Sequence, residues 1–241
     1  MIIFGIDTTA VAASAAVLKD GNLVSECYLN AGLTHSQTMM ELIDAALKLA
    51  GVTVREVDCF AVAHGPGSFT GVRIGVSAVK GLSFPENKPC YGISTLEALA
   101  NCADLEDCLI CPVMDARCRQ VYTALFRKED GTIFRLTEDE PLSLDELAVR
   151  LSEYSDPVML IGDGTDVAYE HLAPRNDNVK KYSAVFRLQH ASGVAIAAWK
   201  RYNSGVEPCS GAQLQPVYLR LSQAERELKK KNEAKEKESE P

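Results

Sequence analysis

Several patterns that assign a protein to a class are missing from this chain of 241 residues. No apolar run approaches the roughly 20 residues that a membrane-spanning helix needs, so the sequence does not predict an integral membrane protein. Residues 1–7 have neither the basic region nor the small-residue cleavage site of a secretory signal, and we expect a cytoplasmic protein. At 46% apolar residues, the chain is too hydrophobic to be disordered, except in one tail.

Positive charge is also scarce. The formal net charge is −8, with 25 Lys and Arg against 33 Asp and Glu. Affinity for nucleic acid comes largely from Lys and Arg side chains that neutralise phosphates. We therefore do not expect the chain to bind RNA or DNA tightly by itself.

Motifs of common catalytic sites are absent as well. The four histidines form no H-x-x-x-H or H-E-x-x-H pair, so we expect no metal site. The Gly-rich segment 65–71 lacks the Gly-Lys-Ser/Thr of a P-loop, and its Ser68 does not stand in a Gly-x-Ser-x-Gly nucleophile elbow. We predict no catalytic residue from these patterns.

The pattern of apolar runs and turns predicts an α/β protein made of two copies of one unit. In the first copy, two strands joined by an Asp20-Gly21 hairpin follow the strand that ends at Asp7. A capping box, Thr34-x-x-Gln37, starts a helix that runs to about Ala50. A strand, the Gly-rich turn and a second helix complete the copy, and they are predicted over residues 57–63, 65–71 and 72–84.

The second copy repeats this order of elements. Strands are predicted over 109–114, 121–127 and 132–136, with an Asp-Gly hairpin at 130–131 between the last two. A capped helix over 143–152 and a strand over 158–161 follow. We therefore expect two mixed-sheet subdomains, residues 1–100 and 101–221, with a cleft between them. The last helix, over 191–202, can pack back on the first subdomain. Residues 222–241 are rich in Lys and Glu, which predicts a solvated or disordered tail.

Two aspartates, Asp7 and Asp115, end corresponding strands and would face the cleft in a duplicated fold of this kind. Carboxylates, hydroxyls and the backbone N–H groups of Gly-rich turns are the groups that bind Mg²⁺ and phosphate. An equally simple interpretation is that the two aspartates cap the turns after their strands. The candidate cofactor-binding residues are Asp7, Thr8, Thr9, Gly65, Gly67 and Asp115.

The two helices of the first copy indicate a partner surface. Apolar residues of the first helix cover more than half of its circumference, which exceeds the stripe of about 100° that one core needs. Small residues recur on one face of the second helix and would let another helix approach. The alternative is a helix pair that is buried within its own core. The candidate partner-binding residues are Met39, Leu42, Ile43, Ala46, Gly71, Arg73, Gly75 and Ala78.

Four segments resemble the bacterial TsaB (YeaZ) family, and the likeness extends to about residue 222. They are Ile6-Asp7-Thr8-Thr9, residues 65–75, Asp115-Ala116-Arg117 with Tyr122, and Pro216-x-Tyr218-Leu219-Arg220. The resemblance implies the duplicated actin/Hsp70-like (ASKHA, RNase H-like) ATPase fold. It also implies a non-catalytic subunit that activates the related enzyme TsaD. Together with the small ATPase TsaE, such subunits support N6-threonylcarbamoylation of adenosine 37 in tRNAs that read ANN codons.

The resemblance also suggests why a metal pair is missing. The H-x-x-x-H of the catalytic relative would fall on Thr95 and Leu99, which cannot bind a metal. The two helix faces described above also predict a homodimer when the chain is alone. The acidic charge predicts that tRNA is contacted through the partner. Adenine nucleotide with Mg is expected only in the multi-subunit complex. Gln120 departs from the Glu that is usual in the family. Two alternatives remain: an ATP-dependent phosphotransferase of the same fold and, less favoured, a metallopeptidase of the M22 glycoprotease type.

Overall fold

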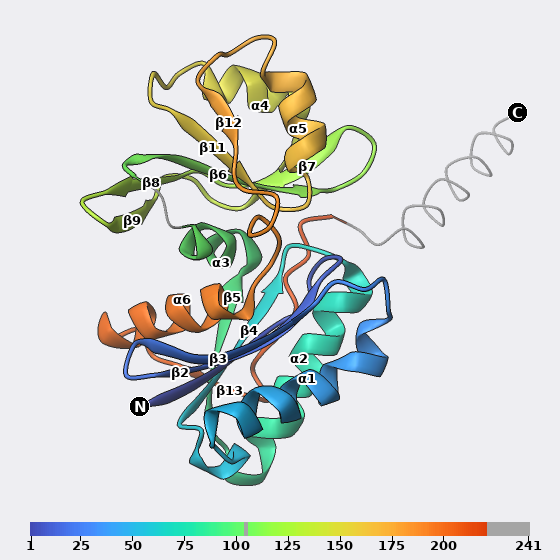
Figure 1. Cartoon of the computed structure of the whole chain (residues 1–241), viewed down its shortest axis with the longest axis vertical. Coiled ribbons are helices and arrows are strands. Elements are labelled where there is room, and N and C mark those ends of the chain that lie inside the picture. Colours follow the sequence, from blue (N-terminus) through green and yellow to red (C-terminus); the bar gives the residue numbers. More distant parts are fainter. Residues whose placement is uncertain (104–105, 221–241) are drawn as a thin grey trace, which may run out of the picture.

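The computed structural model describes residues 1–103 and 106–220, which form two lobes stacked along the long axis of the molecule (Figure 1). The first lobe surrounds a six-stranded sheet with strand order β13-β5-β4-β1-β2-β3. The second surrounds a seven-stranded sheet with the order β10-β7-β6-β11-β12, from which β8 and β9 branch at β6. The predicted tail, residues 222–241, lies outside the described residues.

The elements of the first lobe come mostly from the first part of the chain. They are β1 (Ile2–Asp7), β2 (Ala13–Lys19), β3 (Asn22–Leu29), α1 (His35–Ala50), η1 (Val54–Glu56), β4 (Cys59–Gly65), α2 (Phe69–Ser83), η2 (Phe84–Glu86), β5 (Pro89–Ser94) and α3 (Thr95–Cys102). The chain then forms the second lobe, whose elements are β6 (Cys108–Asp115), β7 (Gln120–Thr123), β8 (Phe126–Glu129), β9 (Thr132–Arg135), β10 (Glu140–Ser143), α4 (Leu144–Leu151), β11 (Val158–Ile161), α5 (Thr165–Leu172) and β12 (Val179–Lys181). It returns to the first lobe with α6 (Ala191–Asn203) and β13 (Cys209–Ser210).

The first sheet is covered on both faces, with α1 and α2 on one side and α6 on the other (Figure 1). β1 and β4 are therefore buried on both faces and read as continuous apolar runs. The Asp20-Gly21 hairpin between β2 and β3 forms as predicted, with φ of 50° at Asp20 and 82° at Gly21. No helix in the described part of the chain is long and apolar enough to cross a membrane.

The predicted capping boxes have different outcomes. Ser143 and Glu146 form theirs at the start of α4, with the Ser143 hydroxyl accepting from the Glu146 amide. α1 begins after Thr34 as expected, but the Thr34 side chain caps no amide, so that predicted box is wrong. The backbone N–H of Gln37 donates instead to the backbone carbonyl of Thr34. Helix position was therefore predictable here, whereas the side-chain geometry was not.

In the second lobe, the single strand predicted over 121–127 is wrong, because the chain leaves the ladder in the middle. β7 pairs with β10 and the end of β6, whereas β8 pairs with the start of β6 and with β9. Ala124 and Leu125 lie between them and are fully buried. The Leu125 amide donates to the Thr137 hydroxyl at 2.9 Å rather than to a strand.

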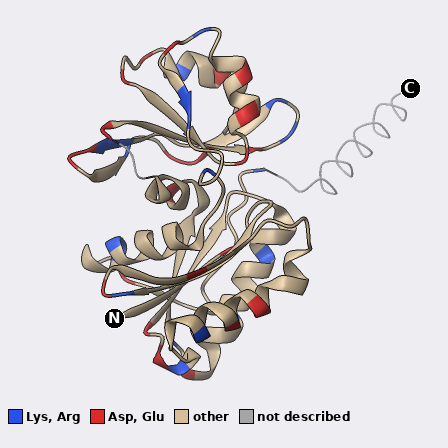
Figure 2. Ribbon diagram, in the orientation of Figure 1, with Lys and Arg blue, Asp and Glu red and all other residues tan. Residues whose placement is uncertain are grey.

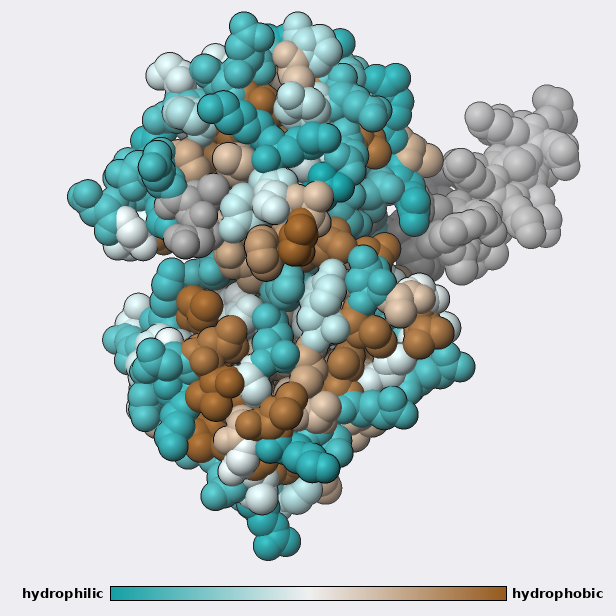
Figure 3. Space-filling view, viewed as in Figure 1, coloured by the Kyte–Doolittle hydropathy of each residue, from teal (hydrophilic) through white to brown (hydrophobic). Residues whose placement is uncertain are grey.

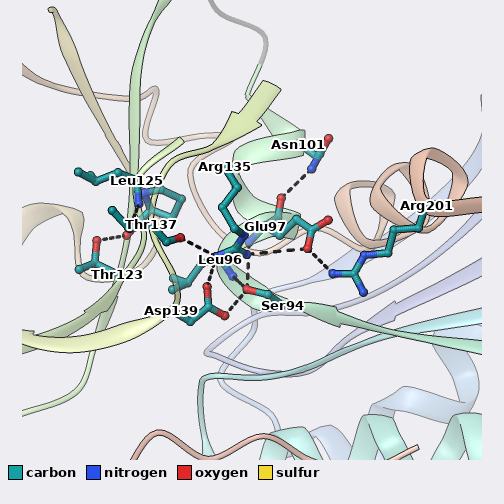
Figure 4. Close-up of polar contacts among 11 residues, drawn as sticks. Ser94, Leu96, Glu97, Asn101, Thr123, Leu125, Arg135, Thr137, Asp139 and Arg201 are labelled. Carbon is teal, nitrogen blue, oxygen red and sulfur yellow. Dashed lines mark hydrogen bonds and ion pairs between the residues drawn. The ribbon is translucent and has the colours of Figure 1, made fainter. Parts of the chain in front are cut away.

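α3, which the sequence analysis did not predict, lies between the lobes. Its Ala98 packs with the core of the first lobe, while Leu96 and Leu99 pack with the core of the second. A polar network runs beside it: Glu97 accepts from Arg201 of α6 at 2.6 Å and pairs with Arg135 of β9 at 3.8 Å (Figure 4). Hydrophobic contacts and ion pairs therefore both link the two lobes.

Candidate functional site

An open cavity of about 410 Å³ separates the lobes. Its floor is built where β1 and β6, the corresponding first strands of the two lobes, come to an end. The lining residues are Thr9, Ala10, Val11, Gly67, Ser68, Phe69, Met114, Asp115, Ala116, Arg117, Tyr122, Asp163, Val217, Tyr218, Leu219 and Arg220. Three of the six candidate cofactor-binding residues, Thr9, Gly67 and Asp115, therefore line the cleft.

The other three candidates lie beneath the cleft surface. Asp7 and Thr8 are at most 1% exposed, and the Thr8 hydroxyl donates to the Gly71 carbonyl at 2.7 Å. A Cβ on Gly65 would lie only 2.1 Å from the carbonyl oxygen of Val217. These residues hold β1, β4, α2 and residues 215–220 together, and Asp7 caps the turn after β1, as in the simpler of the two interpretations.

Asp7 is an unusual buried carboxylate. Its Oδ1 accepts hydrogen bonds from the Thr9 amide at 2.8 Å and the Thr9 hydroxyl at 2.7 Å. Its Oδ2 has no hydrogen-bond partner among the described residues. Burial raises the pKa of Asp7 to about 6, although the bonds from Thr9 oppose this shift. At neutral pH the first lobe therefore holds a negative charge in its interior.

The acidic groups that do face the cleft come from the second lobe. Asp115 accepts from the Arg117 amide at 2.8 Å and pairs with the Arg117 side chain at 3.3 Å. Asp163 accepts from Gln189 at 3.1 Å, and burial raises its pKa. Sequence reasoning missed Asp163 as a site residue, although it stands two residues after β11 in a Gly-Asp-Gly turn. Asp115 and Asp163 could contribute oxygen ligands to a cation with phosphate, but Asp7 is not placed to join them.

A second hollow lies on the outer face of the first lobe, between α1 and α2. This helix groove has a volume of about 650 Å³ and is lined by Ser36, Met39, Met40, Phe69, Thr70, Arg73, Ile74, Ser77 and Ala78. Met40 is 59% exposed, so the groove has an apolar wall open to solvent. Figure 3 shows apolar side chains gathered over the first lobe and the lobe junction, whereas the second lobe is largely hydrophilic.

The candidate partner-binding residues divide between groove and core. Met39, Arg73 and Ala78 line the helix groove, and Leu42 is half-buried. Ile43 and Ala46 are at most 2% exposed and belong to the lobe's own core. The apolar arc of α1 is wide because one part packs on the sheet while another part borders the groove.

Two residues of the predicted small-residue face of α2, Gly71 and Gly75, face strands of their own lobe and not a partner helix, whereas Ala78 lines the helix groove. A Cβ on Gly71 would lie 2.0 Å from the Thr8 carbonyl, and one on Gly75 would lie 2.6 Å from the Thr8 hydroxyl. These glycines let α2 approach β1 and β4 of its own lobe. Partner residues must therefore be sought on the opposite side of α2, where Arg73 and Ser77 are exposed.

Metal-binding residues do not gather in the structure. Within residues 1–103 and 106–220, no three His, Cys, Asp or Glu side chains are placed to hold one ion. Thr95 and Leu99 are buried in α3. Basic and acidic positions are interspersed over both lobes (Figure 2).

Comparisons with known proteins agree on one family. The TsaD family model, described as tRNA N6-adenosine threonylcarbamoyltransferase, matches residues 30–228. The tRNA threonylcarbamoyladenosine biosynthesis protein TsaB of Bacillus subtilis is 32% identical over 167 residues, which cover 69% of this chain and 73% of that protein. TsaB of Escherichia coli is 28% identical over 231 residues, or 95% of this chain and 98% of that protein.

Solved structures give the same result. YeaZ from Pseudomonas aeruginosa superposes with a TM-score of 0.77 at 26% identity and covers 90% of this chain and 99% of its own. Component A of (R)-2-hydroxyglutaryl-CoA dehydratase from Acidaminococcus fermentans has a TM-score of 0.51 at 14% identity, with 84% and 99% covered, and is similar in fold alone. The expected duplicated, actin-like ATPase fold is confirmed. By its sequence and its fold, the chain belongs to the TsaD family of tRNA-modification proteins and, within it, to the TsaB (YeaZ) members.

Proposed function

We propose that this protein is a non-catalytic subunit that binds and activates a TsaD-like enzyme for N6-threonylcarbamoylation of adenosine 37 in tRNAs reading ANN codons. The observation that carries the proposal is the helix groove: an apolar, solvent-open surface on a chain whose relatives are named for threonylcarbamoyladenosine biosynthesis. The groove takes an apolar helix of the partner, and in the absence of the partner it takes the same surface of a second copy.

The complex that follows from this proposal has further members. A TsaE-like small ATPase joins it in the cytoplasm, and tRNA is contacted mainly through the catalytic subunit. The net charge of −8 supports indirect contact, because few counterions are released when an acidic chain meets RNA. Adenine nucleotide with Mg belongs to the multi-subunit complex rather than to this chain alone.

The groove is tested by a matched pair of substitutions on α1. Met40 lines the groove and is 59% exposed, whereas Leu49, on the same helix, is 74% exposed and does not line it. Met40→Glu is expected to weaken binding of the TsaD-like subunit and homodimer formation by about tenfold or more, since it buries a charge in an apolar contact. Leu49→Glu is expected to leave both unchanged. Equal affinities for the two variants would place the interface elsewhere.

The non-catalytic role has its own test. The purified chain, supplied with threonylcarbamoyl-adenylate and tRNA, is expected to transfer nothing until the TsaD-like subunit is added. Transfer by the chain alone would overturn the proposal. Filter binding at physiological salt is expected to give no sub-micromolar affinity of the chain for tRNA.

The phosphotransferase alternative is kept because Asp115 and Asp163 face the cleft. It predicts micromolar binding of ATP with Mg²⁺ to the isolated chain, which calorimetry measures directly. Our proposal predicts no such binding, since Asp7 is buried under Thr9 and residues 217–220 form part of the cleft wall.

A further inference from the structure

The C-terminal segment 215–220, here called the strap, lies along the cleft and is anchored to the first lobe through its backbone. The Val217 amide donates to the His64 carbonyl at 2.7 Å, and His64 Nδ1 donates to the Gln215 carbonyl at 3.2 Å. The Val217 carbonyl approaches Gly65 so closely that no side chain fits there. The strap is therefore fixed against the end of β4.

The side chain of Tyr218 ties the strap to the helix groove. Its ring stacks on Phe69 at 4.5 Å between centroids, and its hydroxyl accepts from Arg73 Nε at 2.9 Å. The Arg73 guanidinium lies 3.9 Å above the Phe69 ring, so the three side chains form one stack. Phe69 and Arg73 both line the helix groove, which places one end of this stack at the proposed docking surface.

The far end of the strap reaches the second lobe. Arg220 Nη1 donates to the Ala116 carbonyl at 2.8 Å. Ala116 directly follows Asp115 at the end of β6, and residues 217–220 form one wall of the cleft. A single short segment thus contacts the groove, the cleft and the opposite lobe.

We propose that the strap couples the helix groove to the cleft. The proposal rests on the proposed function, because the occupant of the groove is the TsaD-like subunit. A partner seated in the groove fixes Phe69 and Arg73, and these hold Tyr218 and with it the strap across the cleft. The loop after β6 is steadied through Arg220. Because binding equilibria are reciprocal, a change that frees the strap also weakens partner binding.

The link can be cut at its far end without altering the groove. Arg220 does not line the groove, so Arg220→Ala breaks the bond to Ala116 and leaves the stack of Phe69, Arg73 and Tyr218 intact. Tyr218→Phe is the second variant, since it keeps the ring and removes the bond to Arg73. Arg55→Ala, in η1, is the control, since its side chain is 89% exposed and lines neither the groove nor the cleft.

The experiment is hydrogen exchange on the full chain, alone and with saturating TsaD-like subunit, with the affinity measured separately by calorimetry. In the wild type and in Arg55→Ala, the partner is expected to slow exchange in segments 215–220 and 116–123 by about fivefold or more. Arg220→Ala is expected to lose the protection of 116–123 and, by the same reciprocity, to weaken partner binding modestly, by about two- to threefold. Tyr218→Phe is expected to lose about half or more of the protection in both segments.

Each failure has a distinct signature. If the wild type does not bind the partner in calorimetry, the proposed function is wrong. If the partner binds and exchange in 116–123 does not change, the coupling is wrong and the proposed function stands. If Arg220→Ala keeps the protection of 116–123, the partner touches that loop directly, and the strap carries no coupling.

Discussion

Asp7 and Thr9 are joined by two hydrogen bonds to the same oxygen. The Thr9 amide and hydroxyl both donate to Oδ1 of Asp7, at 2.8 and 2.7 Å, while Oδ2 is buried with no partner among the described residues. One oxygen of the Asp7 carboxylate is thus hydrogen-bonded, and the other is buried without such a bond. A buried charge in this state lowers stability unless a proton is taken up.

Asp7→Asn is expected to stabilise the protein above pH 7. Between about pH 4 and pH 6 the folded chain carries a proton on Asp7 and the unfolded chain does not, because burial raises the pKa from 3.8 to about 6. The wild type therefore loses stability as the pH rises through that window, by up to about 3 kcal/mol. Asparagine keeps the Oδ1 acceptor, and its unpaired amide offsets part of the gain, so we expect a net gain of about 1–2 kcal/mol.

Urea unfolding at pH 4 and pH 7.5 measures this effect. The difference between variant and wild type should be larger at pH 7.5 than at pH 4. A difference that is the same at both pH values would show that folding does not raise the pKa of Asp7. Asp44→Asn, at an exposed position of α1, is the control and is expected to change little.

Two glycines of α2 are expected to respond in opposite directions to alanine. Gly75→Ala places a Cβ 2.6 Å from the Thr8 hydroxyl and should destabilise the fold by about 1–3 kcal/mol. Gly81 has no atom within 4 Å of the same position, so Gly81→Ala should stabilise by about 0.5–1 kcal/mol through helix propensity. Thermal unfolding of both variants measures the two stability changes. A lower melting temperature for Gly81→Ala than for the wild type would contradict the prediction.

Capping gives a second matched pair. The Ser143 hydroxyl accepts from the Glu146 amide, so Ser143→Ala should cost about 1 kcal/mol. The Thr34 side chain caps nothing, so Thr34→Ala should change stability by less than about 0.5 kcal/mol. A loss at Thr34 comparable to that at Ser143 would mean that the predicted capping box forms in solution.

Glu97 is expected to matter more than an exposed carboxylate in a similar ion pair. It is 18% exposed and lies between Arg201 and Arg135, one from each lobe. Glu97→Gln should cost about 1–2 kcal/mol, since it removes the carboxylate that pairs with the partly buried Arg201, while Arg135 keeps Asp139 at 2.6 Å. Glu129, 57% exposed and 3.7 Å from Arg127, is the control, and Glu129→Gln should cost less than about 0.5 kcal/mol.

Order and type of elements were predictable from the sequence because turns and periodicity are local. The hairpins at Asp20-Gly21 and Asp130-Gly131 both adopt positive φ as expected, and α1 ends at Gly51 in the left-handed conformation. α2 begins three residues earlier than predicted, because Ser68 caps it and the Gly-rich turn flows directly into the helix. β5 and α3 were missed.

The candidate site was less predictable because it depends on contacts between distant segments. Nothing near Met39 and Met40 in the sequence says that the first is 2% exposed and the second 59%. The glycines of α2 were predicted to face a partner helix, because nothing in the sequence shows that Thr8 packs against them in the folded lobe. The contact between Gly65 and Val217 joins residues far apart in the chain, so the role of the strap could not be predicted from either one.

The return of the chain to the first lobe has a consequence for its synthesis. One face of the sheet that contains β1 stays uncovered until α6, which begins at Ala191, has left the ribosome. Making the stretch between Ser94 and Ala191 takes roughly 5–20 s at about 5–20 residues per second. During that time Ile3, Ala61 and Ile93 present an apolar surface to the cell. The nascent chain is therefore a ready client for chaperones, and a chain that stops before Ala191 leaves that surface permanently open.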